Sequence, residues 1–175
     1  EELRMIGADT MIRVGTAGAM RAEMEVGSLA IISGAIRDEG TSLHYMPIEF
    51  PAVADIEVTQ ALISSAKTNK QKYWTGITQS KDSFYGQHHP DQMPVASKLL
   101  ERWKAWQMGG AICSEMEAST LFVLGSIYKV RTGGVMLITG NQLRRETINP
   151  KPDLSGLIQT TIEALRVLIR SDHKR

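Results

Sequence analysis

The chain has 175 residues, and its 20 basic and 19 acidic side chains leave a formal net charge of +1. This length fits one domain with a substantial core, and the balanced charge argues against a nucleic-acid-binding protein. Its single cysteine, Cys113, excludes an internal disulfide, and no apolar run is long enough for a membrane span. We therefore expect a cytoplasmic protein with neither nucleic acid nor a membrane among its partners.

The first candidate site lies near the N-terminus. Apolar residues predict a strand up to Val14, and Gly15-Thr16-Ala17-Gly18 predicts a loop after it. Arg13 at the end of this strand, the Thr16 hydroxyl and the backbone N–H groups of the loop would suit an anion such as phosphate. A tight turn without a ligand explains the same glycines. Residues 1–7 resemble the end of a helix, so we expect that sequence is missing upstream.

Two more strands are expected in the first half of the chain, at residues 28–36 and 72–79. The segment between Arg37 and Ala54 is long for a connection, which indicates a role at a site or between subunits. His44 in this segment fits a solvated side chain. Asp55 predicts the N-cap of a helix that runs to Lys67.

The second half of the chain continues the alternation of helices and strands. It predicts helices at 97–108, 114–128 and 154–170, strands at 111–113 and 133–139, and polar loops at 80–92 and 140–152. We therefore expect an α/β fold of three layers, with a central mixed, largely parallel sheet flanked by helices. Ligands bind beyond the carboxyl ends of strands in such folds, where four polar loops would meet.

The segment Ser114-Glu115-Met116-Glu117 has two interpretations. As a capping box, Ser114 would be the N-cap of a helix and Glu117 its N3 residue. As a binding segment, it would direct one carboxylate to two neighbouring hydroxyls, such as those of a ribose. Both hold if the helix begins at the site. Apolar residues at helical spacing predict the buried faces of the last two helices: Met116, Leu121, Leu124 and Tyr128 in one, and Leu157, Ile158, Ile162, Leu165, Leu168 and Ile169 in the other.

Five segments together resemble the nucleoside phosphorylase I family, and within it the uridine phosphorylases. They are Arg13-Val14-Gly15-Thr16-Ala17-Gly18, Ser42-Leu43-His44, Glu49-Phe50-Pro51-Ala52-Val53-Ala54-Asp55, Asp82-Ser83-Phe84-Tyr85-Gly86-Gln87 and Ser114-Glu115-Met116-Glu117. The run from Phe84 to Gln87 is typical of the pyrimidine branch. The resemblance implies a single nucleoside phosphorylase domain over residues 1–175 that corresponds to the C-terminal two-thirds of the family fold.

The resemblance also implies an activity. Uridine and phosphate would give uracil and ribose 1-phosphate without a metal or an organic cofactor, in a homo-oligomer that is a hexamer built from dimers. Because the N-terminal part of the family fold holds further phosphate ligands, we expect the 175-residue chain alone to be inactive. Alternatives are a purine nucleoside phosphorylase or nucleosidase of the same fold, and a non-catalytic nucleoside-binding or storage protein. The resemblance implies an Asp beyond the last long strand in members that act on purines, and the lack of an acid in residues 139–142 therefore argues against purine nucleosides.

Residue by residue, the resemblance implies contacts to phosphate, ribose and base. Arg13 and Thr16 match phosphate ligands. Glu115, Met116 and Glu117 match ribose contacts, with Glu117 on the 2′- and 3′-hydroxyls. Gly18, Phe84 and Gln87 match the base pocket, and Asn141 is a further candidate for the base edge.

One departure from the family concerns the donor to uracil. Many uridine phosphorylases carry an arginine after Gly-Gln, whereas this chain has Gly86-Gln87-His88-His89. Lys81 and His88, with His89 as the weaker candidate, are expected to replace it, as in a streptococcal-like subgroup. The alternative is that Lys81 is a solvated loop charge. Arg13, Lys81 and His88 are thus the predicted catalytic residues.

Overall fold

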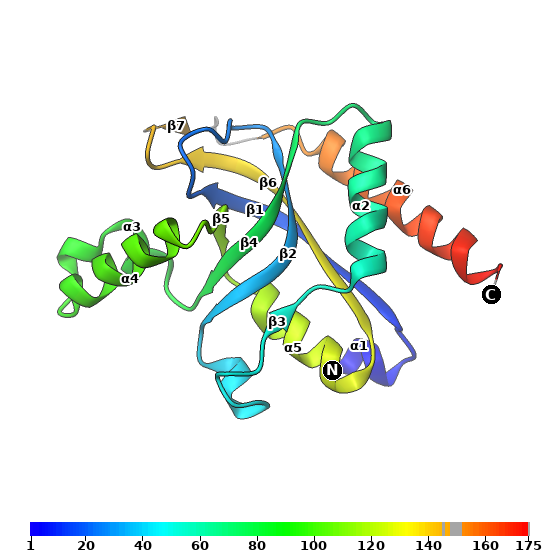
Figure 1. The fold of residues 1–175 in the computed structure, drawn as a ribbon, viewed down its shortest axis with the longest axis horizontal. Coiled ribbons are helices and arrows are strands. Elements are labelled where there is room, and N and C mark those ends of the chain that lie inside the picture. Colours follow the sequence, from blue (N-terminus) through cyan, green and yellow to red (C-terminus); the bar gives the residue numbers. More distant parts are fainter. Residues whose placement is uncertain (145, 148–151, 175) are drawn as a thin grey trace.

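The structure is a computed structural model that describes residues 1–144, 146–147 and 152–174 (Figure 1). Its strands are β1 (Thr10–Ala19), β2 (Leu29–Asp38), β3 (Ala52–Val53), β4 (Tyr73–Lys81), β5 (Cys113–Glu115), β6 (Arg131–Asn141) and β7 (Glu146–Thr147). The helices are α1 (Glu2–Met5), α2 (Ile56–Thr68), α3 (Phe84–His88), α4 (Ala96–Met108), α5 (Ala118–Tyr128) and α6 (Ser155–Asp172), with 3₁₀ turns η1 (Thr41–His44) and η2 (Pro90–Gln92).

Helices cover both faces of one mixed sheet, which confirms the α/β class. In Figure 1, α5 lies against one face, and α2 and α6 lie side by side against the other. The alternation of side chains along a strand explains why the sheet has two cores. In β2, Ala30 and Ile32 pack in the core on the α5 side, whereas Leu29 and Ile31 pack in the core under α2 and α6.

The sheet curls until it closes on itself, which the expected three-layer arrangement did not include. Its strand order is β3-β2-β4-β5-β1-β6-β7, and β2 pairs with β6 as well. The two longest pairings, β1 with β6 and β2 with β4, are parallel, while β5 runs antiparallel to β1. Strand twist brings distant strands together in this way, and no local pattern in the sequence records it.

The expected loop at Gly15 is wrong, because β1 continues through it to Ala19. Pairing with β6 runs from Thr10 to Ala19, so the backbone groups belong to a strand and Arg13 lies in its middle. A Cβ atom on Gly15 would lie 2.0 Å from Nη1 of Arg13. The glycine therefore makes room for the arginine side chain instead of forming a turn.

Two helix caps were predicted, and one is confirmed. The carboxylate of Asp55 accepts hydrogen bonds from the N–H groups of Glu57 (2.9 Å) and Val58 (3.1 Å), as an N-cap does. The capping box at Ser114 is wrong, because Ser114 and Glu115 belong to β5 and α5 begins at Ala118.

The predicted buried faces of the last two helices are only partly right. In α5 the buried apolar side chains include Phe122 and Val123, and the predicted stripe instead lines a hollow of ≈ 400 Å³ beside α1. In α6, Leu157 and Leu168 are buried as expected, but four of the predicted residues are exposed: Ile158, Ile162, Leu165 and Ile169. The apolar stripe of α6 is thus wider than the surface that covers it.

The connection after β2 and the connection after β6 both contain more structure than expected. Arg37 is buried and donates to the Ser42 hydroxyl and to backbone carbonyls of Ser42, Met46, Pro47 and Phe50, which fixes the segment after β2. His44 is exposed, as predicted. The expected loop 140–152 contains β7, and its residues 145 and 148–151 lie outside the described part of the chain.

An arm formed by α3 and α4 projects from the sheet (Figure 1). Helix α4 has no buried residue, and an ion pair between Arg102 and Asp38 ties it to the end of β2. Among the described helices, none combines the length and the apolar character that a bilayer crossing requires.

Candidate active site

A cleft of ≈ 1120 Å³ lies between the sheet and the arm. The segments that the sequence placed at strand ends all contribute to it. Every predicted site residue lines the cleft: Arg13, Thr16, Gly18, Lys81, Phe84, Gln87, His88, Glu115, Met116, Glu117 and Asn141. The structure therefore brings these residues together, and their individual roles stay predictions.

Arg13 and Glu117 form an ion pair in the cleft. Nε and Nη2 of Arg13 lie 3.1 Å and 2.6 Å from Oε2 of Glu117, and Nη1 donates to the Val14 carbonyl. The side chains are 26% and 55% exposed, so a ligand can reach both. A guanidinium has five N–H donors, so one N–H on each terminal nitrogen is left for an anion.

Thr16 and Gly18 follow Arg13 along β1. Thr16 is exposed, and regular alternation directs it to the face of the strand opposite Arg13. Both Arg13 and Thr16 line the cleft, and β5 pairs with β1 only at Gly18 and Ala19. A Cβ atom on Gly18 would meet nothing within 4 Å, which shows that this part of the wall is open.

Lys81 is the last residue of β4 and is only 6% exposed. Its Nζ lies 2.7 Å from Oγ of Ser114 and 3.5 Å from the carbonyl oxygen of Glu115. Burial lowers the pKa of the Lys81 ammonium, although the carboxylates of Glu115 and Glu117 act in the opposite direction. The alternative that Lys81 is a solvated loop charge is wrong.

The Ser114 hydroxyl is the centre of a polar network that the sequence did not reveal. Its Oγ lies 2.8 Å from Oε1 of Gln79 and 3.0 Å from Oε1 of Gln87. Nε2 of Gln79 donates to Oδ2 of Asp38 over 2.7 Å. Burial is the main reason why the pKa of the Asp38 carboxyl is raised. Gln79 stands two residues before Lys81, a strand spacing that places both on one face and could have identified it.

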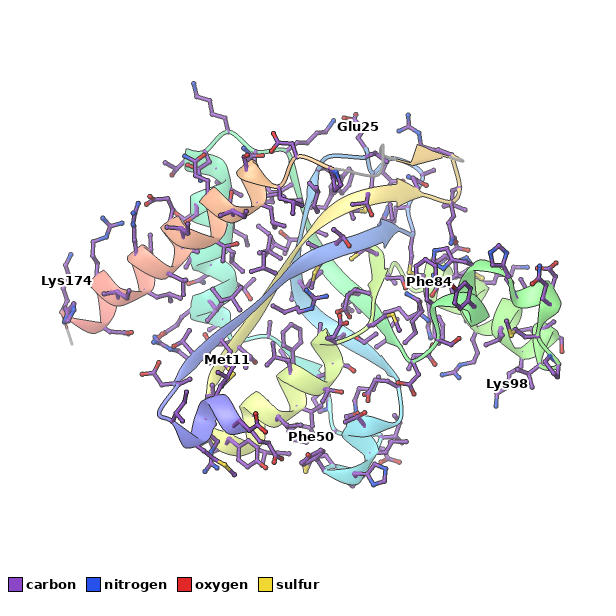
Figure 2. The ribbon with its side chains drawn as sticks, turned by 180° about the vertical axis from the view of Figure 1, so that it is seen from behind. Met11, Glu25, Phe50, Phe84, Lys98 and Lys174 are labelled. Carbon is purple, nitrogen blue, oxygen red and sulfur yellow. The ribbon has the colours of Figure 1, made fainter. Side chains whose placement is uncertain are left out.

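Aromatic side chains of the arm form one wall of the cleft. Figure 2 shows Phe84 at the base of the arm, where α3 joins the sheet. The His88 ring stacks on Phe84 with centroids 3.9 Å apart, and His88 Nδ1 lies 2.9 Å from the Phe84 carbonyl oxygen. Trp103 and Trp106 of α4 also line the cleft, although the sequence offered them only as helix residues. This wall suits a flat ring.

Two predicted contacts have side chains that are engaged elsewhere. The carboxylate of Glu115, buried so that its pKa is raised, accepts from the Ser80 hydroxyl and from the N–H groups of Glu117 (2.8 Å) and Ala118 (2.9 Å). It therefore satisfies two backbone N–H groups where α5 begins. Nδ2 of Asn141 donates to the carbonyls of Arg21 (2.9 Å) and Met24 (2.8 Å), which leaves it no donor for a base.

With this geometry in place, comparisons with known proteins identify the family. A family model described as the phosphorylase superfamily matches residues 1–162. The chain belongs to the phosphorylase superfamily. This confirms the resemblance drawn from the five sequence segments, while the streptococcal-like subgroup stays a prediction.

Curated members of the superfamily cover most or all of this chain. It is 47% identical to a uridine phosphorylase of Treponema pallidum, over the whole chain and 69% of that protein. It is 40% identical to a uridine phosphorylase of Thermococcus kodakarensis, over the whole chain and 63% of that protein. A guanosine phosphorylase of Halorubrum lacusprofundi is 34% identical over 81% of the chain and 54% of its own length. The chain thus spans about two thirds of the length of these uridine phosphorylases.

The superfamily member shows no protein-built metal centre in the part described. Within residues 1–144, 146–147 and 152–174, no three His, Cys, Asp or Glu side chains gather in a way that could hold an ion. The chemistry of the cleft is instead that of a guanidinium, an ammonium, carboxylates, amides and aromatic rings.

Proposed function

We propose that this phosphorylase-superfamily protein cleaves uridine with phosphate to give uracil and ribose 1-phosphate. The observation that carries the proposal is the contact of Arg13 with Glu117 in a cleft that also contains Lys81 and Gln87. The cleft then contains a cation that can bind phosphate, a carboxylate that can bind ribose and polar groups that can bind the base. The two relatives quoted above with the highest identities are uridine phosphorylases, which supports the same substrate.

The reaction breaks the bond between C1′ of ribose and N1 of uracil and forms one between C1′ and a phosphate oxygen. Arg13 holds the phosphate next to the sugar, so that attack occurs within one complex. Glu117 accepts hydrogen bonds from the 2′- and 3′-hydroxyls and thereby fixes the ribose. The bonding electrons leave with uracil, whose negative charge is taken up by donors of the cleft.

Lys81 and His88 are the proposed donors to the departing uracil. The Lys81 ammonium is held at a buried position by Ser114, where an electrostatic interaction is stronger than in water. One preorganised donor of this kind stabilises a transition state by about 3 kcal/mol. His88 stacks on Phe84, which we propose packs on the base. Phosphate is a co-substrate, and we propose no metal or organic cofactor.

We also propose that the protein is a homo-oligomer, a hexamer built from dimers, in the cytoplasm. Supporting this, the segment between Arg37 and Ala54 exposes Leu43, Ile48 and Val53, each 52% accessible. The four exposed apolar residues of α6 add a second such surface. Light scattering on the full-length protein tests the assembly, and a monomer at micromolar concentration would contradict it.

The decisive experiment for the function measures nucleoside cleavage by the full-length protein. Uridine and inosine are each supplied with and without phosphate, and the released base is quantified. We expect uracil release that depends on phosphate. Preference for inosine would instead support the purine alternative, which the guanosine phosphorylase relative favours. Binding of uracil and phosphate without turnover, measured by calorimetry, would indicate a non-catalytic binding protein.

A further inference from the structure

A chain of side-chain interactions runs from the arm to Gln87. Arg102 of α4 pairs with Oδ1 of Asp38, and Oδ2 of Asp38 accepts from Nε2 of Gln79 over 2.7 Å. Oε1 of Gln79 lies 2.8 Å from Oγ of Ser114, which in turn lies 3.0 Å from Oε1 of Gln87. Gln79 is buried, whereas Gln87 on the short helix α3 is half-buried.

The chemical groups at the start of this chain give it a direction. An arginine only donates and a carboxylate only accepts, so Gln79 donates its N–H to Asp38 and turns Oε1 toward Ser114. The Ser114 hydroxyl has one proton, while both Gln79 and Gln87 present an oxygen to it. Only one of these oxygens can accept that proton at a time. Asp38 holds the N–H end of the Gln79 amide and Ser114 holds its oxygen, so Gln79 is better placed than Gln87 to accept the Ser114 proton.

We propose that Gln79 is a positioning residue that determines which end of the Gln87 amide faces a ligand. When Gln79 takes the Ser114 proton, the Gln87 amide turns over from the orientation in which its Oε1 lies 3.0 Å from Ser114 Oγ. The Ser114 oxygen then accepts from Lys81 and from the amide N–H of Gln87. The carbonyl end of Gln87 then faces the cleft and accepts from a ring N–H that lies between two carbonyls, as in uracil. Without Gln79, the Ser114 proton goes to Gln87 and its N–H end faces the cleft.

This inference rests on the proposed uridine phosphorolysis, and a double-mutant cycle in the full-length protein tests it. Gln79→Met and Gln87→Met keep the side-chain length and remove the amide. We expect Gln79→Met to lower kcat/KM for uridine about tenfold, the cost of one lost hydrogen bond, with KM for phosphate unchanged. In protein that already carries Gln87→Met, the second substitution should cost nothing further.

Thr78→Val is the matched control, because Thr78 is the buried neighbour of Gln79 in β4. Its Oγ1 lies 3.1 Å from the Cys113 carbonyl oxygen, so the variant also loses a buried hydrogen bond. We expect its effect to be additive with Gln87→Met. If Gln79→Met is additive as well, Gln79 has only a structural role and the proposal is overturned.

A second measurement does not depend on activity. The side-chain amide signals of Gln87 are assigned in ¹⁵N spectra of the full-length protein, and their shifts are compared between variants. We expect Gln79→Met to move them and Thr78→Val to leave them in place. If uridine is not cleaved at all, the proposed function fails and these signals decide alone: movement in Gln79→Met supports the positioning role, and unchanged signals overturn it.

Discussion

Nη2 of Arg13 lies 2.6 Å from Oε2 of Glu117, although 104 residues separate them in the chain. The contact joins the middle of β1 to the residue that precedes α5. It depends on Gly15, over which the arginine side chain lies. An anion site and a sugar site therefore share one ion pair, and a change that moves Arg13 should affect both.

Gly15→Ala should displace the Arg13 guanidinium, because the new Cβ would occupy space within 2.0 Å of Nη1. We expect KM for phosphate to rise about tenfold, equivalent to roughly 1.4 kcal/mol. The change in Tm should be small, since the atoms in the way belong to the end of a flexible side chain. Steady-state kinetics of the full-length protein with varied phosphate measure the effect.

Gly40→Ala is the control for this substitution. Gly40 has φ −89°, which alanine adopts without strain, and its new Cβ would be 3.6 Å from Asp82 Oδ2. We expect unchanged phosphate kinetics. A Gly15→Ala enzyme whose KM for phosphate equals that of Gly40→Ala would show that Arg13 does not hold the anion.

Lys81→Ala should lower kcat/KM for uridine about a hundredfold, because it removes a buried donor to the departing base. His88→Ala should lower it by about tenfold, since a more exposed donor contributes less. Lys98→Ala is the control, because Lys98 lies on an exposed part of the arm well away from Phe84 in Figure 2. This variant should leave kcat/KM for uridine unchanged. Losses under about threefold in both test variants would reject the assignment of these donors.

Glu39→Gln should make the free energy of unfolding depend differently on pH. Burial alone would raise the pKa of Glu39, but hydrogen bonds from Ser42, Ser119 and Thr120 lower it below its ordinary value of 4.5. The ionised form is thus favoured by folding, so its stabilisation is complete above pH 4.5 and is lost as the pH falls through the lower folded pKa.

We expect Glu39→Gln to cost about 2 kcal/mol at pH 7, from weaker hydrogen bonds to a group that no longer carries charge. The difference from the wild type should shrink below pH 4.5, which urea unfolding at several pH values measures. Glu49→Gln changes an exposed carboxyl of the same segment and should have little effect. A gap between Glu39→Gln and wild type that stays constant down to pH 3 would contradict the prediction.

Cys113 should resist alkylation in the native protein. The thiol is fully buried, which raises its pKa to about 12, so almost no thiolate is present at pH 8. Mass spectrometry after treatment with iodoacetamide should show labelling only as fast as the protein unfolds, and complete labelling in urea. Native labelling at the rate of a free cysteine would show that β5 opens readily.

The protein's order of elements could be read from short stretches of sequence. The Asp55 cap depends on two N–H groups within three residues of it, and the strand at Leu29–Asp38 shows as an apolar run. The loops that meet in the cleft were predicted because their residue types and their positions at strand ends are local features. The same local view misjudged Gly15, since a glycine that makes room for a side chain and a glycine in a turn look alike.

The sequence by itself determined the fold class, the family and the site residues that its motifs contain, because periodicity, caps and motifs depend on residues that are neighbours in the chain. Only the tertiary structure decided that β2 also pairs with β6, that Lys81 is buried and that Ser114 joins Gln79 to Gln87. Each of these depends on groups that are distant in the chain and meet only after the sheet has twisted and closed, so no local pattern could specify them.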